Sequence, residues 1–297
     1  MTWLASAAAI AGFSWGYLPD PVIPSDNPLT PAKVALGKRL FSEPLLSAGR
    51  AYSCASCHQP ERHFTDGRPR AVGAGGDTLA HNTPTLYYAG FNSSLGWQAN
   101  GARTLEQQHQ TPLFSNSPLE MGFSGENLAD LSLDDRYPPL FSAAFPDDGI
   151  STTSVIRALA SYVRTIVPAP SAFDAYLFDD DQHALSAMAV AGMRLFFSPR
   201  LGCSNCHASL AFSGPISHVL EQTPPAFHVT GVGGSDAAFR APTLRRVAAT
   251  APYMHDGSMA TLQQVLQHYQ NVAAKHVPSF TLSADEQAQV IAFLHTL

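Results

Sequence analysis

Two segments of the sequence share the pattern C-x-x-C-H: Cys54-Ala-Ser-Cys57-His58 and Cys203-Ser-Asn-Cys206-His207. At this spacing two thiols can form thioethers to one porphyrin, and the adjacent histidine can bind its iron. All four cysteines of the chain lie in these motifs. A Cys₄ zinc site does not require a histidine after each pair, and no βαβ unit suggests a thioredoxin-like motif. The sequence therefore predicts two covalently bound haem c groups.

Haem c is attached outside the bacterial cytoplasm, so we expect the chain to be exported to the periplasm. The stretch from Trp3 to Trp15 is apolar, but Lys33 is the first cationic side chain. We interpret residues 1–12, within a terminal segment 1–22, as the remnant of an export signal or as an ordinary N-terminal arm. The sequence contains no run of 18 or more apolar residues, so it predicts no conventional membrane-spanning helix. The net charge of −6 argues against nucleic-acid binding.

An internal repeat surrounds the two motifs. Leu36-Gly37-Lys38-Arg39-Leu40-Phe41 precedes the first motif, and Gly192-Met193-Arg194-Leu195-Phe196 precedes the second. Each copy predicts a short helix ending in Leu-Phe, then a loop, then the cysteines. We therefore expect a mostly α fold with two cytochrome c-like domains, 23–168 and 169–297, each holding one haem. The 23 prolines and 21 glycines predict long loops between the helices.

Helical periodicity and capping signals predict four of the helices. Apolar residues recur from Val155 to Ile166, after Thr152 and Thr153 as caps and before Pro168. A second helix is predicted over 184–197. Residues 262, 265, 266 and 269 recur at helical spacing, which places Tyr269 on a buried stripe. The last helix begins with the capping box Ser283-x-x-Glu286.

Candidate acid/base groups follow the first motif. A peroxide-reacting haem needs one open iron position and a proton-transferring group beside it. The stretches Thr104 to Pro112 and Pro118 to Gly122 offer such groups: a glutamate beside a vacant haem face can move a proton between the oxygens of peroxide, an amide can orient the peroxide, and a proline supplies no strong ligand. The alternative is a surface loop with an incidental glutamate.

In these segments the sequence resembles the bacterial di-haem cytochrome c peroxidase family and its MauG branch. The resemblance covers nearly the whole chain. It rests on both haem motifs and on four further segments, which are Asn82-Thr-Pro-Thr85, Gln108 to Glu120, Arg240-Ala-Pro-Thr-Leu-Arg245 and Thr250-Ala-Pro-Tyr-Met-His-Asp-Gly257. Other segments, such as Phe227-His-Val-Thr-Gly231, are most similar to MauG-like homologues found with methanobactin biosynthesis genes.

The resemblance implies roles around the first haem. His58 would be the proximal ligand of the peroxide-reactive haem, with Gln108, Pro112 and Glu120 on its distal face. The family separates the proline and glutamate by six residues, whereas here they are eight apart (120 − 112). No histidine lies in the stretch 71–78, where many peroxidases carry a switchable ligand, so we expect this haem to be open at rest.

The second haem would have His207 as proximal ligand. Peroxidases of the family usually provide a methionine opposite it, and the corresponding position here is Tyr269. A tyrosine at this position is the pattern of the MauG branch. A phenolate ligand stabilises oxidised iron, whereas a methionine ligand favours ferrous iron. Met254 and Met259 are rival ligands, and Tyr269 could instead be an ordinary core residue.

Two further sites follow from the resemblance. Trp97 matches the tryptophan that relays electrons between the haems, although a core tryptophan is the alternative. A calcium ion lies between the domains in the family. The Asn82 side chain and the carbonyls of Thr250 and Pro252 match its ligands, and hard oxygen donors suit calcium.

The function that we infer from the sequence is a MauG-like oxidation of a partner protein. Hydrogen peroxide would oxidise an aromatic residue, such as a tryptophan converted to kynurenine, through high-valent haem iron. The partner would be a periplasmic protein, with a copper-binding protein as one candidate. One alternative is a cytochrome c peroxidase supplied by a small cytochrome or cupredoxin as electron donor. The other is a non-enzymatic di-haem electron carrier.

Overall fold

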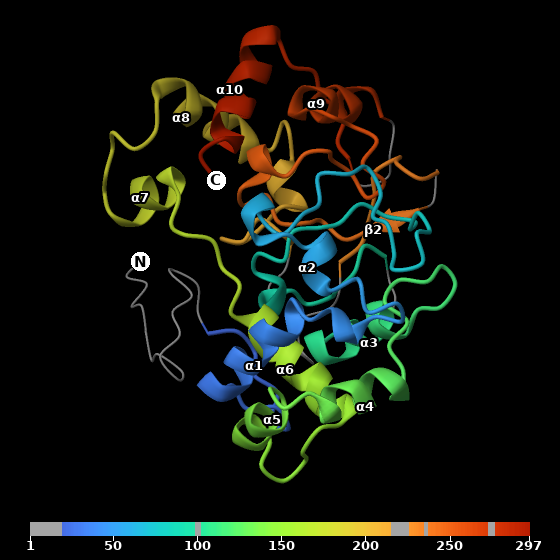
Figure 1. Cartoon of the computed structure of the whole chain (residues 1–297). Helices are drawn as coiled ribbons and strands as arrows, with labels where there is room; N and C mark the ends of the chain where they lie inside the picture. The colour runs from blue at the N-terminus through green and yellow to red at the C-terminus, as the bar shows by residue number, and fades with distance from the viewer. Residues whose placement is uncertain (1–19, 99–101, 215–225, 235–236, 273–276) are drawn as a thin grey trace.

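The computed structural model describes residues 20–98, 102–214, 226–234, 237–272 and 277–297 (Figure 1). The interpretation of residues 1–12 as an export signal or arm lies outside the described residues. Helices dominate, and the one sheet of the described residues is a two-stranded antiparallel ribbon of β1 (His228–Val229) and β2 (Ala238–Phe239). The mostly α fold class is therefore confirmed. Within the described ranges, no helix is long and apolar enough to cross a membrane.

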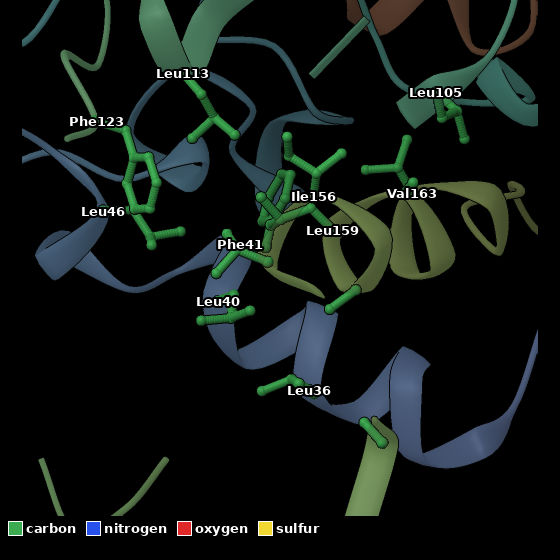
Figure 2. Close-up of a cluster of buried hydrophobic side chains, with 14 of the residues drawn as sticks. Leu36, Leu40, Phe41, Leu46, Leu105, Leu113, Phe123, Ile156, Leu159 and Val163 are labelled. Carbon is green, nitrogen blue, oxygen red and sulfur yellow. The ribbon is translucent and has the colours of Figure 1, made fainter. Parts of the chain in front are cut away.

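The first half of the chain packs around two crossing helices, α1 (Pro31–Phe41) and α6 (Thr152–Arg164). Figure 2 shows their apolar faces meeting at Leu40, Phe41 and Leu159. Gly37 lets the two backbones approach, because a Cβ there would overlap the Ala158 carbonyl oxygen. The remaining helices of this half are α2 (Cys54–Cys57), α3 (Leu105–Phe114), α4 (Gly125–Leu133) and α5 (Pro138–Ala144), with 3₁₀ turns at 44–46, 60–62 and 89–91.

The second half repeats this packing with α8 (Ala187–Phe196) and α10 (Ala284–Leu294). Gly192 occupies the position equivalent to Gly37, and a Cβ there would overlap the Gln289 carbonyl oxygen. The predicted repeat is thus a repeated helix crossing that requires glycine at the contact. The remaining helices are α7 (Ala172–Phe178) and α9 (Leu262–Asn271), with 3₁₀ turns at 203–205 and 247–249.

The helix boundaries agree with the prediction in two cases and differ in two. Helix α9 covers the predicted stripe, and Ser283 and Glu286 form the predicted capping box of α10. The cap of α6 is Ser151 rather than Thr152 or Thr153, because Ser151 Oγ accepts a hydrogen bond from the Ser154 amide. Helix α8 begins at Ala187 rather than 184, because the Ser186 hydroxyl caps its first turn.

Two large apolar clusters form the core. One contains buried residues between Leu36 and Ile166, and the other contains buried residues between Phe173 and Leu297. The predicted boundary at 168/169 falls between α6 and α7, and it stays a prediction. The halves meet at a small cluster that includes Phe91 and Ala211, and the hydroxyl of Ser213 donates to Asn92 Oδ1 at 2.9 Å.

Candidate haem sites

The first C-x-x-C-H motif forms the one-turn helix α2, with the His58 amide donating to the Cys54 carbonyl at 2.9 Å. The His58 ring uses Nδ1 for a hydrogen bond to the Phe64 carbonyl at 3.1 Å. Phe64 adopts a left-handed conformation, φ 61°, that aims its carbonyl at the ring. Burial lowers the pKa of His58, so the imidazole is neutral, which is the form that binds a metal.

The second motif repeats this arrangement. His207 Nδ1 bonds to the Phe212 carbonyl at 3.0 Å, and Phe212 is again left-handed, with φ 52°. Burial lowers the pKa of His207 to about 4. Both candidate proximal histidines are therefore neutral and oriented through Nδ1 by a backbone carbonyl, as metal-binding histidines usually are.

A cavity of about 210 Å³ lies beside the second motif. Cys203, Cys206 and His207 line it, and most of the remaining wall is apolar. The cysteines are free thiols whose pKa is raised by burial, in the case of Cys203 to about 12. An apolar cavity with two thiols and one neutral imidazole on its wall has the donors that a covalently attached haem requires, so these residues fit haem c.

Tyr269 faces the same cavity from helix α9. It shares a helix face with the buried Leu262 and Leu266, but it stays partly accessible because the cavity lies in front of it. Burial raises its pKa, and the nearby thiols of Cys206 and Cys203 raise it further. The role of Tyr269 as an iron ligand stays a prediction.

The rival methionines occupy different places. Met254 lines the cavity and adopts a left-handed conformation, φ 72°, in the turn before α9. Met259 lies across the isolated bridge with Tyr253 and is not part of the cavity wall. Of the two methionines, only Met254 lines the cavity, so it is the remaining alternative to Tyr269 as a ligand of the second haem.

Gln108 and Pro112 both lie on helix α3, which Thr104 caps through a hydrogen bond to the Gln107 amide. The chain then turns back, because the Met121 amide donates to the Pro112 carbonyl at 3.1 Å. This contact brings Glu120 next to Pro112 in spite of their eight-residue separation. Gln108 and Pro112 are therefore one turn apart on α3, and the loop after the helix returns to Pro112 at the residue that follows Glu120.

Glu120 is electrostatically coupled to the first motif. Burial raises the pKa of both Cys54 and Cys57, and the charge of Glu120 adds to this shift. Burial raises the pKa of Glu120 itself. A carboxyl group that is easier to protonate than usual is suited to exchanging protons with a bound reactant.

Trp97 connects the two halves of the chain. Its indole Nε1 donates to the Asn82 carbonyl at 2.8 Å, and its own carbonyl accepts from the Arg240 amide at 2.9 Å. The side chain lines the cavity beside the second motif. This position, between residues from both halves, is compatible with the predicted electron relay.

The three predicted calcium ligands, Asn82, Thr250 and Pro252, also line this cavity. The Asn82 amide nitrogen donates to the Arg68 carbonyl at 2.8 Å, which leaves the side-chain oxygen for another partner. The described residues contain no group of three or more His, Cys, Asp or Glu side chains that could hold a metal. The calcium site would therefore depend on amide and carbonyl oxygens, and it stays a prediction.

Sequence reasoning assigned no role to Arg245, which organises the loop after the second motif. Its Nε donates to the Leu210 carbonyl at 2.7 Å, and its guanidinium pairs with Asp174 at 2.8 Å. The same group lies over the rings of Phe173 and Phe212. Since the Phe212 carbonyl orients His207, Arg245 supports the proximal ligand indirectly. The available signal was its place in the Arg240-Ala-Pro-Thr-Leu-Arg245 segment, which carries part of the family resemblance.

His109 was also missed, although it directly follows Gln108. Its Nδ1 bonds to the Leu105 carbonyl at 2.6 Å, one turn earlier on α3. Burial lowers its pKa, and the neighbouring His58 lowers it further, so the ring is neutral and near the first motif.

Comparisons with known proteins agree with this geometry. The family described as di-haem cytochrome c peroxidase matches residues 31–182, and the family described as RoxA-like, cytochrome c-like matches residues 238–273. The methylamine utilization protein MauG of Methylophilus methylotrophus is 34% identical over 94% of this chain and 86% of that protein. Cytochrome c551 peroxidase of Pseudomonas aeruginosa is 32% identical over 91% of this chain and 80% of that protein.

A solved structure matches closely along the whole length. It is a MauG-like protein associated with microbial copper homeostasis, with a TM-score of 0.88 and 34% sequence identity. The match covers 95% of this chain and 93% of that one.

Proposed function

Because the chain belongs to the di-haem cytochrome c peroxidase family, whose members are peroxide-dependent oxidoreductases, we propose that it is a MauG-like enzyme. Its reaction is the oxidation of an aromatic residue, a tryptophan, on a periplasmic partner protein at the expense of hydrogen peroxide. The observation that carries this proposal is that Tyr269, at the position where peroxidases of the family usually have methionine, lines the same cavity as the second motif. The bound haem groups supply the iron that reacts with peroxide and carries the oxidising equivalents.

In this proposal, residues near the first motif transfer the proton of the bound peroxide. Glu120, with its pKa raised by burial, takes a proton from one peroxide oxygen and delivers it to the other, which leaves as water. Gln108 on α3 orients the peroxide by hydrogen bonding, and Pro112 keeps the distal space free of a strong ligand. The Met121–Pro112 backbone contact holds Glu120 beside them.

Electron removal from the partner needs a path between the two motifs. Trp97 provides an indole between them, held by Asn82 and by the backbone of Arg240. Tyr269 would supply a phenolate to the second haem, and this hard anionic donor would favour oxidised iron. Asn82, Thr250 and Pro252 would hold a calcium ion through oxygen atoms, which would stiffen the wall that carries Trp97.

A related protein of known structure suggests the kind of partner protein that would be oxidised. The MauG-like protein of known structure is associated with copper homeostasis. We therefore place a copper-binding periplasmic protein first among the candidate partners.

The alternative function is that of a cytochrome c peroxidase, which reduces peroxide to water with electrons from a small donor protein. Met254 on the cavity wall favours it, because methionine on the second iron raises the potential and eases electron entry.

An EPR spectrum of the ferric protein separates the two functions. We expect one high-spin and one low-spin signal in the wild type, with the low-spin signal altered by Tyr269→Phe. Tyr253→Phe is the matched control, since Tyr253 lines the same cavity but its hydroxyl donates to the Val247 carbonyl at 3.1 Å. A low-spin signal that ignores Tyr269→Phe and responds to Met254→Leu would establish the peroxidase instead.

The partner reaction has its own test. Purified protein is mixed with a periplasmic extract and peroxide, and tryptophan-containing peptides are analysed by mass spectrometry. We expect oxidised tryptophan in one protein only when both enzyme and peroxide are present. Unchanged peptides, together with rapid peroxide turnover when a reduced small cytochrome is added, would refute partner oxidation.

A further inference from the structure

A buried cation without an anionic partner lies on the wall of the cavity beside the second motif. The guanidinium of Arg240 lines the cavity, and burial lowers the pKa of Arg240 to about 10. Its side chain donates to the carbonyls of Gly96 and Ala241, both at 3.1 Å. No carboxylate of the described residues forms an ion pair with it. Burying a charge without a counter-charge is costly, so this position is built for an anion that the polypeptide does not supply.

Two more side chains on the same wall have polar atoms without partners. His255 is 9% exposed, and neither of its ring nitrogens forms a hydrogen bond with a described residue. Thr83 is 3% exposed, and its hydroxyl is likewise unpaired. Buried polar groups nearly always have partners, so both side chains point to an absent hydrogen-bonding group. An imidazole N–H and a hydroxyl are donors that suit an anion.

The backbone segments that carry these three side chains are joined to one another by hydrogen bonds. The Arg240 amide donates to the Trp97 carbonyl, Trp97 Nε1 donates to the Asn82 carbonyl, and the Asn82 amide donates to the His255 carbonyl at 2.7 Å. Thr83 follows Asn82 in the chain. The ring of Phe239, next to Arg240, lies 3.8 Å from the ring of His255, centroid to centroid.

We propose that Arg240, His255 and Thr83 form a carboxylate-binding site for the propionate groups of the haem held at Cys203 and Cys206. Propionates are the only anionic groups of a haem, and the thiols that would attach this haem open onto the same cavity. A guanidinium is the side chain best matched to a carboxylate, because its planar donors can bind both oxygens. The inference requires haem at the second motif, but it does not depend on oxidation of a partner protein.

The site also couples the haem to Trp97. The backbone amide of Arg240 holds the Trp97 carbonyl, and its Nε holds the preceding carbonyl of Gly96. The residue that neutralises the propionate therefore positions the proposed electron relay as well. Arg240 is thus a positioning residue for electron transfer and a charge-compensating residue for the second haem.

The test measures the reduction potential of the second haem in the purified holoprotein, by spectroelectrochemical titration without peroxide or partner. Arg240→Met removes the charge at similar length, Arg240→Lys retains it, and Thr83→Val removes one neutral donor. Arg194→Met is the control, since Arg194 is an exposed arginine on α8. Loss of a cation beside the haem stabilises the more positive ferric state. We expect Arg240→Met to lower the equilibrium constant for reduction about tenfold, which is about 59 mV for a one-electron couple.

The remaining outcomes are also decisive. Arg240→Lys should lie close to wild type, Thr83→Val should shift in the same direction by less, and Arg194→Met should not shift. Infrared redox-difference spectra should show a displaced carboxylate band in Arg240→Met. An unchanged potential and an unchanged carboxylate band in both Arg240→Met and Thr83→Val would overturn the proposal. Because no peroxide is used, that result would leave the proposed oxidation of a partner unaffected.

Discussion

Removing the charge of Asp174 should weaken the support of the second haem motif. Asp174 and Arg245 are 6% and 3% exposed, and they pair at 2.8 Å. Arg245 is also held between Phe173 and Phe212, so it cannot turn to solvent without unpacking the core. In Asp174→Asn the amide retains the shape and the bonds to Ser171 at the start of α7, but Arg245 loses its counter-charge.

The magnitude follows from this burial. Removing one partner of a buried ion pair costs about 3–5 kcal/mol, because the remaining charge stays desolvated. At roughly 2–4 °C per kcal/mol for a protein of this size, the melting temperature should fall by about 6–20 °C. The absorption of the second haem should report the change before unfolding, since the Phe212 carbonyl orients His207.

The assay is thermal unfolding by circular dichroism, with haem absorption recorded in parallel. Asp148→Asn is the control, because Asp148 is 50% exposed and lies 3.5 Å from Arg157, so its loss should cost less than about 1 kcal/mol. The double variant Asp174→Asn/Arg245→Met should recover part of the stability, since it leaves no unpaired charge. Equal melting temperatures for Asp174→Asn and Asp148→Asn would refute the reasoning.

Two further predictions concern the proton-transferring group and the helix crossing. For Glu120, the ionised form is the base, and burial raises its pKa, so the rate of reaction with peroxide should fall as the pH drops through a value above that of an ordinary glutamate. Stopped-flow rates against pH should show this acidic limb in the wild type; Glu120→Gln should lose the limb and react about 10²–10⁴-fold more slowly. A wild-type rate independent of pH across the acidic range would exclude Glu120 as the base. For the helix crossing, Gly192→Ala should separate α8 from α10, because the new Cβ would overlap the Gln289 carbonyl, and it should cost about 1–3 kcal/mol in chemical denaturation. Gly49→Ala, where an added Cβ meets nothing within 4 Å, should leave the denaturation midpoint near that of wild type, and equal midpoints for the two variants would contradict the close-contact explanation.

Local patterns in the sequence predicted much of the fold and both haem motifs. The C-x-x-C-H spacing places two thiols and an imidazole within one helical turn, so four adjacent peptide units are enough to specify it. Helix α9 and the capping box of α10 were predicted for the same reason, because periodicity and caps depend on residues three or four apart. At the start of α6 three neighbouring residues, Ser151, Thr152 and Thr153, carry hydroxyls that could cap the helix, so the local signal was ambiguous, and the cap is Ser151.

For the candidate site too, some residues could be predicted from the sequence, whereas the contacts between them depend on tertiary packing. Sequence alone, through the motifs and the family resemblance they carry, pointed to His58, His207, Glu120 and Tyr269. Tertiary structure decided which side chains meet. Asp174 and Arg245 are 71 residues apart, and Glu120 reaches Pro112 only because a loop returns to α3. The unpaired guanidinium of Arg240 on a cavity wall has no local sequence signature either. Such contacts depend on how distant segments pack and on which charges that packing removes from water, and no window of neighbouring residues contains that information.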